Sequence, residues 1–112
     1  MADAPSGFSG PPGTPTGGEA LARSVTIVNE RGLHARAAAK FSALADTYVS
    51  TITVSNGRED VSGRSIMGLL LLGAAHGADI TISASGRDAA AALDVLCDLV
   101  ASGFGEVPTG RT

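Results

Sequence analysis

The spacing of apolar residues changes several times along this chain between two periods, and this alternation constrains the fold more than any other feature. The runs RSVTIVN (23–29) and DITISAS (79–85) alternate apolar and polar residues, as strands with one buried face do. A third segment, YVSTITVSNGREDVSG (48–63), contains two short β-runs around Asn56-Gly57. Because Asn-Gly suits the positive φ angles of a type I′ turn, these two runs are predicted to form a hairpin.

Between these strands lie three segments with helical character. In ARAAAKFSALA (35–45), apolar residues recur every three or four positions on one face. Ser65 is a suitable N-cap for a second helix, which we expect to end at Gly77 as its C′ residue. A third helix is expected from about residue 87 to residue 102, with Gly103 just beyond its end. The predicted order of elements is therefore β-α-β-β-α-β-α.

This order and the strand pattern together predict the fold class. Three helices cannot cover both faces of a four-stranded sheet, and strands that alternate expose one face to solvent. We therefore expect an α+β fold, an open-faced β-sandwich with a four-stranded, antiparallel-dominated sheet and three helices on one face. Aromatic residues make up only 4% of the chain and tryptophan is absent, so the core is expected to be aliphatic.

The two ends of the chain differ in composition from the middle. Residues 1–20 hold four of the five prolines and no lysine or arginine, and are expected to form a disordered tail. This segment lacks the basic and apolar regions of a signal peptide. Residues 107–112 are expected to be a flexible end, which leaves residues 21–106 as one folded domain.

Charge and cysteine usage exclude several classes of partner. The net charge of −3 offers no basic surface for nucleic acid or for an anionic membrane. No apolar run approaches the roughly 20 residues that span a bilayer. The single cysteine, Cys97, excludes an internal disulfide and fits a cytoplasmic location. His76 is the only histidine besides His34, and no cluster has metal-ligand spacing, so neither a metal nor a cofactor is expected.

His34 lies where a strand-like run ends and an alanine-rich helix begins, behind Gly32. A histidine at such a position can be a packing residue, a helix cap, a metal ligand or a nucleophile. The N-terminus of a helix favours anions and the neutral form of an imidazole. Arg36, two residues later, can donate charge-assisted hydrogen bonds to phosphate. No set of residues suggests a hydrolase triad.

Three segments resemble one known family. GLHARAAAKF (32–41), GRSIMGLLLLGA (63–74) and LVASGFGE (99–106) are similar to the histidine-containing phosphocarrier protein HPr of the phosphoenolpyruvate-dependent phosphotransferase system. The resemblance implies that His34 accepts a phosphoryl group on Nδ1 from phospho-Enzyme I and passes it to an EIIA-type acceptor protein. It also implies a monomeric carrier rather than an enzyme with its own turnover.

The resemblance assigns roles to further residues. Arg36 matches the arginine that contacts the phosphoryl group, and Ser65 matches the regulatory serine that HPr kinase/phosphorylase modifies in bacteria that have this enzyme. An apolar docking surface for partners is implied at Ile66, Met67 and Leu70, which we expect to be exposed. We expect Leu69 and Leu72 to lie in the core instead, because one helix cannot bury all its apolar residues on one side.

Two features leave the function partly open. Ala37 stands where the family usually has a proline, and the sequence favours neither the sugar-transport branch nor the nitrogen-related branch. Two other functions also fit the residues. One is an interaction module that is not phosphorylated and binds partners through the apolar surface near Ser65, with His34 as a helix cap only. The other is a small hydrolase with a histidine nucleophile.

Overall fold

The computed structural model describes residues 19–106. Residues 1–18 of the expected tail (1–20) and the expected flexible end over residues 107–112 lie outside this range. The first strand, β2, begins at Glu19, so the folded domain starts two residues earlier than the expected start at Leu21.

The four strands form one sheet in which every neighbouring pair is antiparallel. They are β2 (Glu19–Thr26), β3 (Thr51–Ser55), β4 (Asp60–Ser62) and β5 (Asp79–Gly86), and their order in the sheet is β2-β5-β3-β4. The two long strands, β2 and β5, pair along their whole length, from Glu19 opposite Gly86 to Thr26 opposite Asp79. The predicted antiparallel sheet is confirmed.

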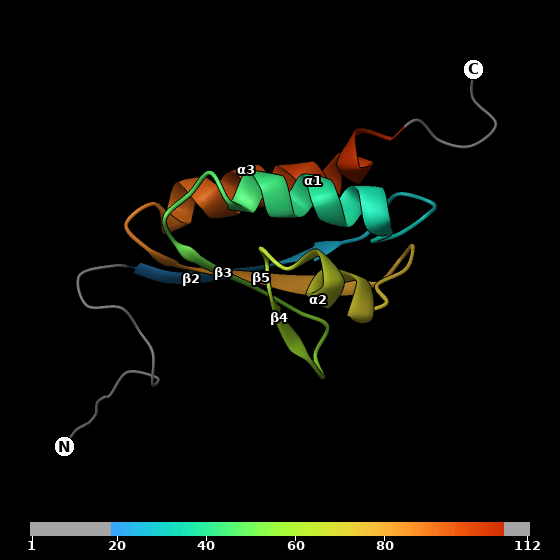
Figure 1. Ribbon diagram of the computed structural model, residues 1–112, viewed down its shortest axis with the longest axis horizontal. Coiled ribbons are helices and arrows are strands. Elements are labelled where there is room, and N and C mark those ends of the chain that lie inside the picture. Colours follow the sequence, from blue (N-terminus) through green and yellow to red (C-terminus); the bar gives the residue numbers. More distant parts are fainter. Residues whose placement is uncertain (1–18, 107–112) are drawn as a thin grey trace.

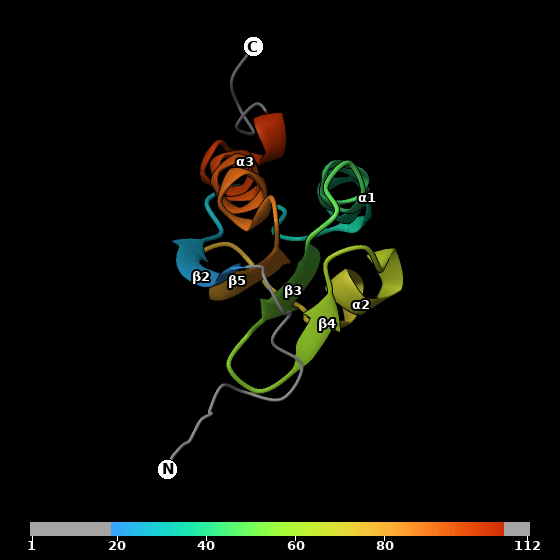
Figure 2. The same cartoon turned by 90° about the vertical axis from the view of Figure 1, so that its left-hand side faces the viewer.

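Three helices cover one face of this sheet (Figures 1 and 2). They are α1 (Ala35–Ala45), α2 (Ile66–Leu71) and α3 (Ala89–Ala101), and a short 3₁₀ turn, η1 (Gly103–Gly105), follows α3. Figure 2 shows α3 above β2 and β5, and α2 beside β4. The other face of the sheet carries no helix within residues 19–106. The open-faced α+β architecture predicted from the periodicity is confirmed.

The core lies between the sheet and the helices and is largely aliphatic, as the composition predicts. Alternate residues of the two central strands point into it, so that β3 and β5 each show a regular pattern of buried and less buried positions. The largest fully buried side chains, each less than 2% exposed, include Phe41, Phe104, Ile27, Ile52, Leu69, Ile82 and Leu96. The buried face of α1 consists of Phe41 and three alanines, Ala37, Ala38 and Ala45.

The loop between β3 and β4 differs from the two-residue type I′ turn that Asn56-Gly57 predicts. Ser55 pairs with Asp60, so four residues connect the strands. Gly57 has a φ of +94°, but Asn56 does not have the positive φ that a type I′ turn requires at its first central position. Instead, Oδ1 of Asn56 accepts hydrogen bonds from the N–H groups of Arg58 at 2.9 Å and Glu59 at 2.8 Å. The predicted hairpin is confirmed, but the predicted type I′ turn is wrong.

Helix α2 ends at Leu71, six residues before the Gly77 that the sequence suggests. Leu72 is its C-cap residue, and Gly73 adopts a φ of +63°, the left-handed conformation that ends many helices. Gly77 also has a positive φ, but it lies in the turn before β5, where its N–H donates to the carbonyl of Ile27. Gly73 and Gly77 both suit a C′ position, and the helix ends at the first of them, Gly73.

Candidate functional site

A tight turn places His34 at the start of α1. Gly32, two residues earlier, has a φ of +68°, a conformation that favours glycine. A Cβ atom on Gly32 would lie 2.6 Å from the carbonyl oxygen of Ala74, so a larger residue would collide with the backbone there. Leu33 donates its N–H to the same carbonyl at 2.9 Å. The turn before α1 is therefore packed against the segment that follows α2.

His34 is the N-cap residue of α1, and both of its ring nitrogens have partners. Nδ1 accepts a hydrogen bond from the backbone N–H of Arg36 at 3.3 Å. Nε2 contacts Oε2 of Glu106, which lies 72 positions further along the chain. The His34 side chain is 21% exposed, so the ring is mostly covered but reaches the surface. Nδ1 thus faces the helix end at which N–H groups lack intrahelical partners and the dipole is positive.

The chain after α3 brings Glu106 to this ring. Gly103, Phe104 and Gly105 have φ angles of +69°, +57° and +72°, which turn the backbone sharply. Phe104 is completely buried, and its carbonyl accepts a hydrogen bond from Nζ of Lys40 on α1 at 2.7 Å. The buried aromatic ring and the bond to α1 hold the turn, and Glu106 follows it directly.

The surroundings of Glu106 keep its carboxyl group ionised. Burial by itself would raise the pKa of Glu106, but hydrogen bonds to His34 and Asn29 and the nearby positive charge of Arg31 outweigh it, so the pKa lies below its usual value. An ionised carboxylate only accepts hydrogen bonds. The proton in the contact with His34 therefore belongs to Nε2, and Nδ1 carries the free lone pair, in agreement with its role as acceptor for the Arg36 N–H.

Arg36 lies in the first turn of α1 with an exposed side chain. Among residues 19–106, no carboxylate forms an ion pair with its guanidinium. The Arg36 backbone N–H is already directed at Nδ1 of His34. The structure thus brings together the two residues that the sequence nominates for phosphate chemistry.

Sequence reasoning missed two residues of this site, Glu106 and Asn29. Glu106 ends the segment LVASGFGE, which carried part of the family resemblance without a role for the glutamate. Two glycines around a phenylalanine after a helix indicate a sharp turn. This turn is the only sequence signal that could have pointed to Glu106. Asn29 is buried and donates to Oε1 of Glu106 at 3.0 Å, a contact across 77 positions that no local pattern indicates.

Ser65, the predicted regulatory serine, is the N-cap residue of α2 as expected. Its Oγ accepts a hydrogen bond from the N–H of Gly68 at 2.9 Å. A Cβ atom on Gly68 would lie 3.0 Å from Val61, so glycine lets α2 approach β4 closely. Ser65 is partly exposed at the end of a six-residue helix, and its hydroxyl is used for capping.

The apolar residues after Ser65 divide between core and surface with one exchange relative to the prediction. Leu69 and Leu72 are buried as expected, and Ile66 and Met67 are 42% and 67% exposed as expected. Leu70 is partly buried and packs against the core, whereas Leu71 is 72% exposed. The expectation of an exposed Leu70 is wrong, because α2 lies with Gly68 and Leu69 inward and turns Leu70 toward the core. We define the apolar patch by its three exposed residues, Ile66, Met67 and Leu71.

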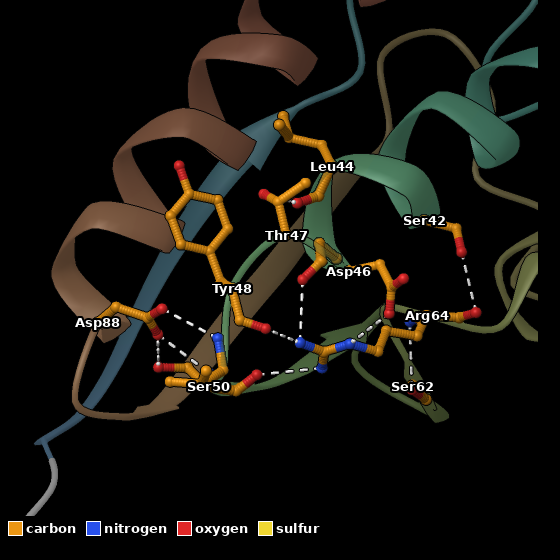
Figure 3. A network of polar contacts seen from close by, with 11 residues as sticks. Ser42, Leu44, Asp46, Thr47, Tyr48, Ser50, Ser62, Arg64 and Asp88 are labelled. Carbon is orange, nitrogen blue, oxygen red and sulfur yellow. Dashed lines mark hydrogen bonds and ion pairs between the residues drawn. The ribbon is translucent and has the colours of Figure 1, made fainter.

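Arg64 connects the segment before Ser65 to the C-terminal end of α1 (Figure 3). Its guanidinium donates to the backbone carbonyls of Ala45, Tyr48 and Ser50. It also lies 3.4 Å from a carboxylate oxygen of Asp46, and its own carbonyl accepts from Oγ of Ser42 at 2.9 Å. The position of Ser65 is thus fixed relative to α1 by its neighbour.

Neither a metal centre nor a membrane span is found in the part of the chain that the structure describes. No three His, Cys, Asp or Glu side chains among residues 19–106 lie where they could hold a metal ion. Within the same residues, no helix has both the length and the apolar character needed to cross a membrane.

Comparison with known proteins places this chain in a family. Residues 21–102 match the family model described as the PTS HPr component phosphorylation site. Phosphocarrier protein HPr of Cupriavidus necator is 43% identical over 86 residues, which cover 77% of this chain and 97% of that protein. Phosphocarrier protein NPr of Shewanella violacea is 46% identical over 86 residues, which cover 77% of this chain and 94% of that protein.

The fold is also that of a solved relative. The crystal structure of HPr-C-His from Thermoanaerobacter tengcongensis superposes with a TM-score of 0.75 at 39% identity, covering 78% of this chain and 98% of that one. The fold and the matched residues therefore define a small phosphocarrier protein of the phosphotransferase system. The chain belongs to the PTS HPr family, as the resemblance of its three segments predicted.

Proposed function

We propose that this chain carries a phosphoryl group on Nδ1 of His34, taken from phospho-Enzyme I and passed to an EIIA-type acceptor protein. The observation that supports this most strongly is the direction of Nδ1, which faces the N-terminus of the 11-residue helix α1 and the N–H of Arg36. HPr and NPr relatives are similarly close in sequence, so the proposed chemistry is the part common to both. The chain acts as a cytoplasmic relay and has no turnover of its own.

In the proposed transfer, the lone pair of Nδ1 attacks phosphorus in line with the P–N bond of the donor phosphohistidine. The P–Nδ1 bond forms as the donor bond breaks, and the electron pair of that bond returns to the donor ring. The backbone N–H of Arg36, which now donates to Nδ1, is then free to donate to a phosphoryl oxygen. The exposed guanidinium of Arg36 adds a charge-assisted donor. Catalysis rests on positioning and charge stabilisation.

The apolar patch is proposed as the docking surface for Enzyme I and for the acceptor. Ser65 lies immediately before the patch, so a phosphate on its Oγ would place close to two negative charges beside it. A dianion there raises the cost of removing water from the patch and repels an acidic partner rim. Phosphorylation by an HPr kinase/phosphorylase would therefore slow phosphorylation of His34.

Incubation with Enzyme I and labelled phosphoenolpyruvate tests the carrier function. We expect stoichiometric, acid-labile label on the wild type and none on His34→Ala. His76→Ala is the matched control, because His76 is the only other histidine and is exposed. Arg36→Ala should be labelled more slowly. Label on His34→Ala would disprove the assignment of the histidine. An unlabelled wild type would favour the interaction module, and continuous phosphate release would favour the hydrolase.

A further inference from the structure

We propose that Asn29 is a positioning residue that holds Glu106 against Nε2 of His34, so that the Nε2 proton is retained before and after the phosphoryl group is added to Nδ1. The first half of this proposal concerns the free protein and stands by itself. The second half, on the phosphorylated ring, rests on the proposed function.

The amide of Asn29 has one possible orientation. Its Nδ2 donates to the carbonyl of Gly32 at 2.8 Å and to Oε1 of Glu106 at 3.0 Å, so both N–H bonds are used. Its Oδ1 is buried and has no hydrogen-bond partner in the structure, and the residue is only 6% exposed. A flipped amide would direct oxygen at two acceptors. The buried oxygen stays unpaired because the two donors are needed where they are.

Asn29 supports both sides of the contact between ring and carboxylate. The carbonyl of Gly32 that accepts from Asn29 also accepts the backbone N–H of His34 at 2.9 Å. One amide thus braces the turn that carries the histidine and the carboxylate that contacts its ring. Glu106 follows a turn built around two glycines, and a second anchor keeps its side chain directed at Nε2.

The Nε2 proton decides how easily the phosphoryl group moves on. When the Nδ1 lone pair of the neutral ring bonds to phosphorus, the ring acquires a positive charge and keeps its Nε2 proton. When the acceptor attacks, the electrons of the P–Nδ1 bond return to the ring, and His34 leaves as neutral imidazole without any proton transfer. If the Nε2 proton were lost to water first, the ring would have to leave as an anion. A carboxylate on Nε2 opposes that loss.

The charges around the ring come from three segments. Glu106 faces Nε2, Arg36 is on α1 near Nδ1, and Arg31 in the preceding turn lies close enough to lower the pKa of Glu106. Lys40 on α1 is bonded to the carbonyl of Phe104. Asn29 is neutral, so replacing it removes hydrogen bonds from this cluster without changing its charge.

Nitrogen NMR on the full chain with ¹⁵N-labelled histidine tests the first half, at a pH where the ring is neutral. The ring shifts show which nitrogen carries the proton, and the exposed His76 is an internal reference in the same spectrum. We expect the Nε2–H form of His34 in the wild type and a several-fold larger share of Nδ1–H in Asn29→Leu and Glu106→Gln. Asn29→Ser, which keeps one donor, should be intermediate and carries the test if Asn29→Leu does not fold.

Glu59→Gln, an exposed carboxylate in the loop between β3 and β4, controls for the loss of one negative charge and should leave the His34 ring unchanged. A wild-type ring with its proton on Nδ1 overturns the proposal. Unchanged tautomers in folded Asn29 variants remove the role of Asn29, even if Glu106→Gln has an effect.

The second half is tested by the rate at which phosphorylated chain passes its label to an acceptor, measured against pH. The wild-type rate should stay level toward alkaline pH, whereas Asn29→Leu should fall by a factor on the order of 10, the scale typical of removing a residue that orients a histidine. Parallel pH profiles would overturn this half. If the wild type takes no label at all, the carrier function fails instead, while the tautomer measurement still decides the role of Asn29.

Discussion

Replacing Arg64 by alanine should destabilise the domain strongly for a side chain that is partly exposed. The guanidinium donates to three carbonyls between the end of α1 and the start of β3. They are those of Ala45 at 2.9 Å, Ser50 at 3.0 Å, and Tyr48. A hydrogen bond from a charged donor contributes about 1.5–3 kcal/mol when shielded. The side chain is 31% exposed, so water replaces part of each bond and about 1 kcal/mol apiece is the better figure.

The expected loss for Arg64→Ala is therefore about 3 kcal/mol in the free energy of unfolding, or about 12 °C or more in Tm for a domain of this size. Urea unfolding at neutral pH, analysed by linear extrapolation, measures it, and an unchanged m value would show that the folded state is otherwise intact. Arg64→Lys keeps the charge but lacks the planar fork that reaches three carbonyls. Its free energy of unfolding should therefore fall by about 2 kcal/mol.

Arg58 offers the matched control, since it is an exposed arginine in the loop between β3 and β4. Arg58→Ala should change stability by no more than about 0.5 kcal/mol. A loss below about 1 kcal/mol for Arg64→Ala, or one equal to that of Arg58→Ala, would refute the reasoning. The contacts of Arg64 would then be ones that water replaces without cost.

Three further predictions concern the cap, acid stability and the patch. Ser65→Ala should lose about 0.5–2 kcal/mol in thermal or urea unfolding, whereas Ser65→Asp should keep the cap but slow Enzyme I-dependent labelling of His34. Equal labelling of Ser65→Asp and wild type would leave the serine a cap alone. The hydrogen bonds from the Ser50 hydroxyl and from neighbouring backbone N–H groups hold the pKa of Asp88 below its ordinary 3.8. This group therefore stabilises the fold above that pH and less as pH falls below it, and Asp88→Asn should unfold with a weaker dependence on pH in acid; identical acid profiles would contradict this. Leu71→Ser should leave stability within about 0.5 kcal/mol but weaken Enzyme I binding in titration calorimetry, and unchanged affinity would exclude Leu71 from the docking surface.

Elements with a strong local pattern were predictable from the sequence. The boundaries of α1 agree with the prediction at both ends, because the alanine-rich run begins right after the capping His34 and ends where the apolar spacing stops. The alternation in β5 gave the correct buried face, with Ile80, Ile82 and Ala84 inward. In both cases the signal lies within the segment itself.

The errors arose where distant parts of the chain decide the outcome. Which side of the short helix α2 faces the core depends on how closely Gly68 approaches β4, so the exchange of Leu70 for Leu71 has no sequence signal. The contact between His34 and Glu106 spans 72 positions, and the sequence shows only that a turn precedes the glutamate. The sequence therefore nominates His34 as a site residue but carries no signal for the contact that Glu106 makes with its ring.

The route of the chain out of the domain has a practical consequence for work with fusions. Glu19 begins β2 at one end of the sheet, and α1 starts at the opposite end, where η1 also lies (Figure 1). Glu106, the last residue described, touches the His34 ring, so anything joined to the C-terminal side leaves from beside that ring. A purification tag or fluorescent partner added after residue 112 is separated from Glu106, which touches the His34 ring, by only six residues, whereas one added before residue 1 enters the domain at the far end. Kinetic comparisons are therefore best made with N-terminal fusions.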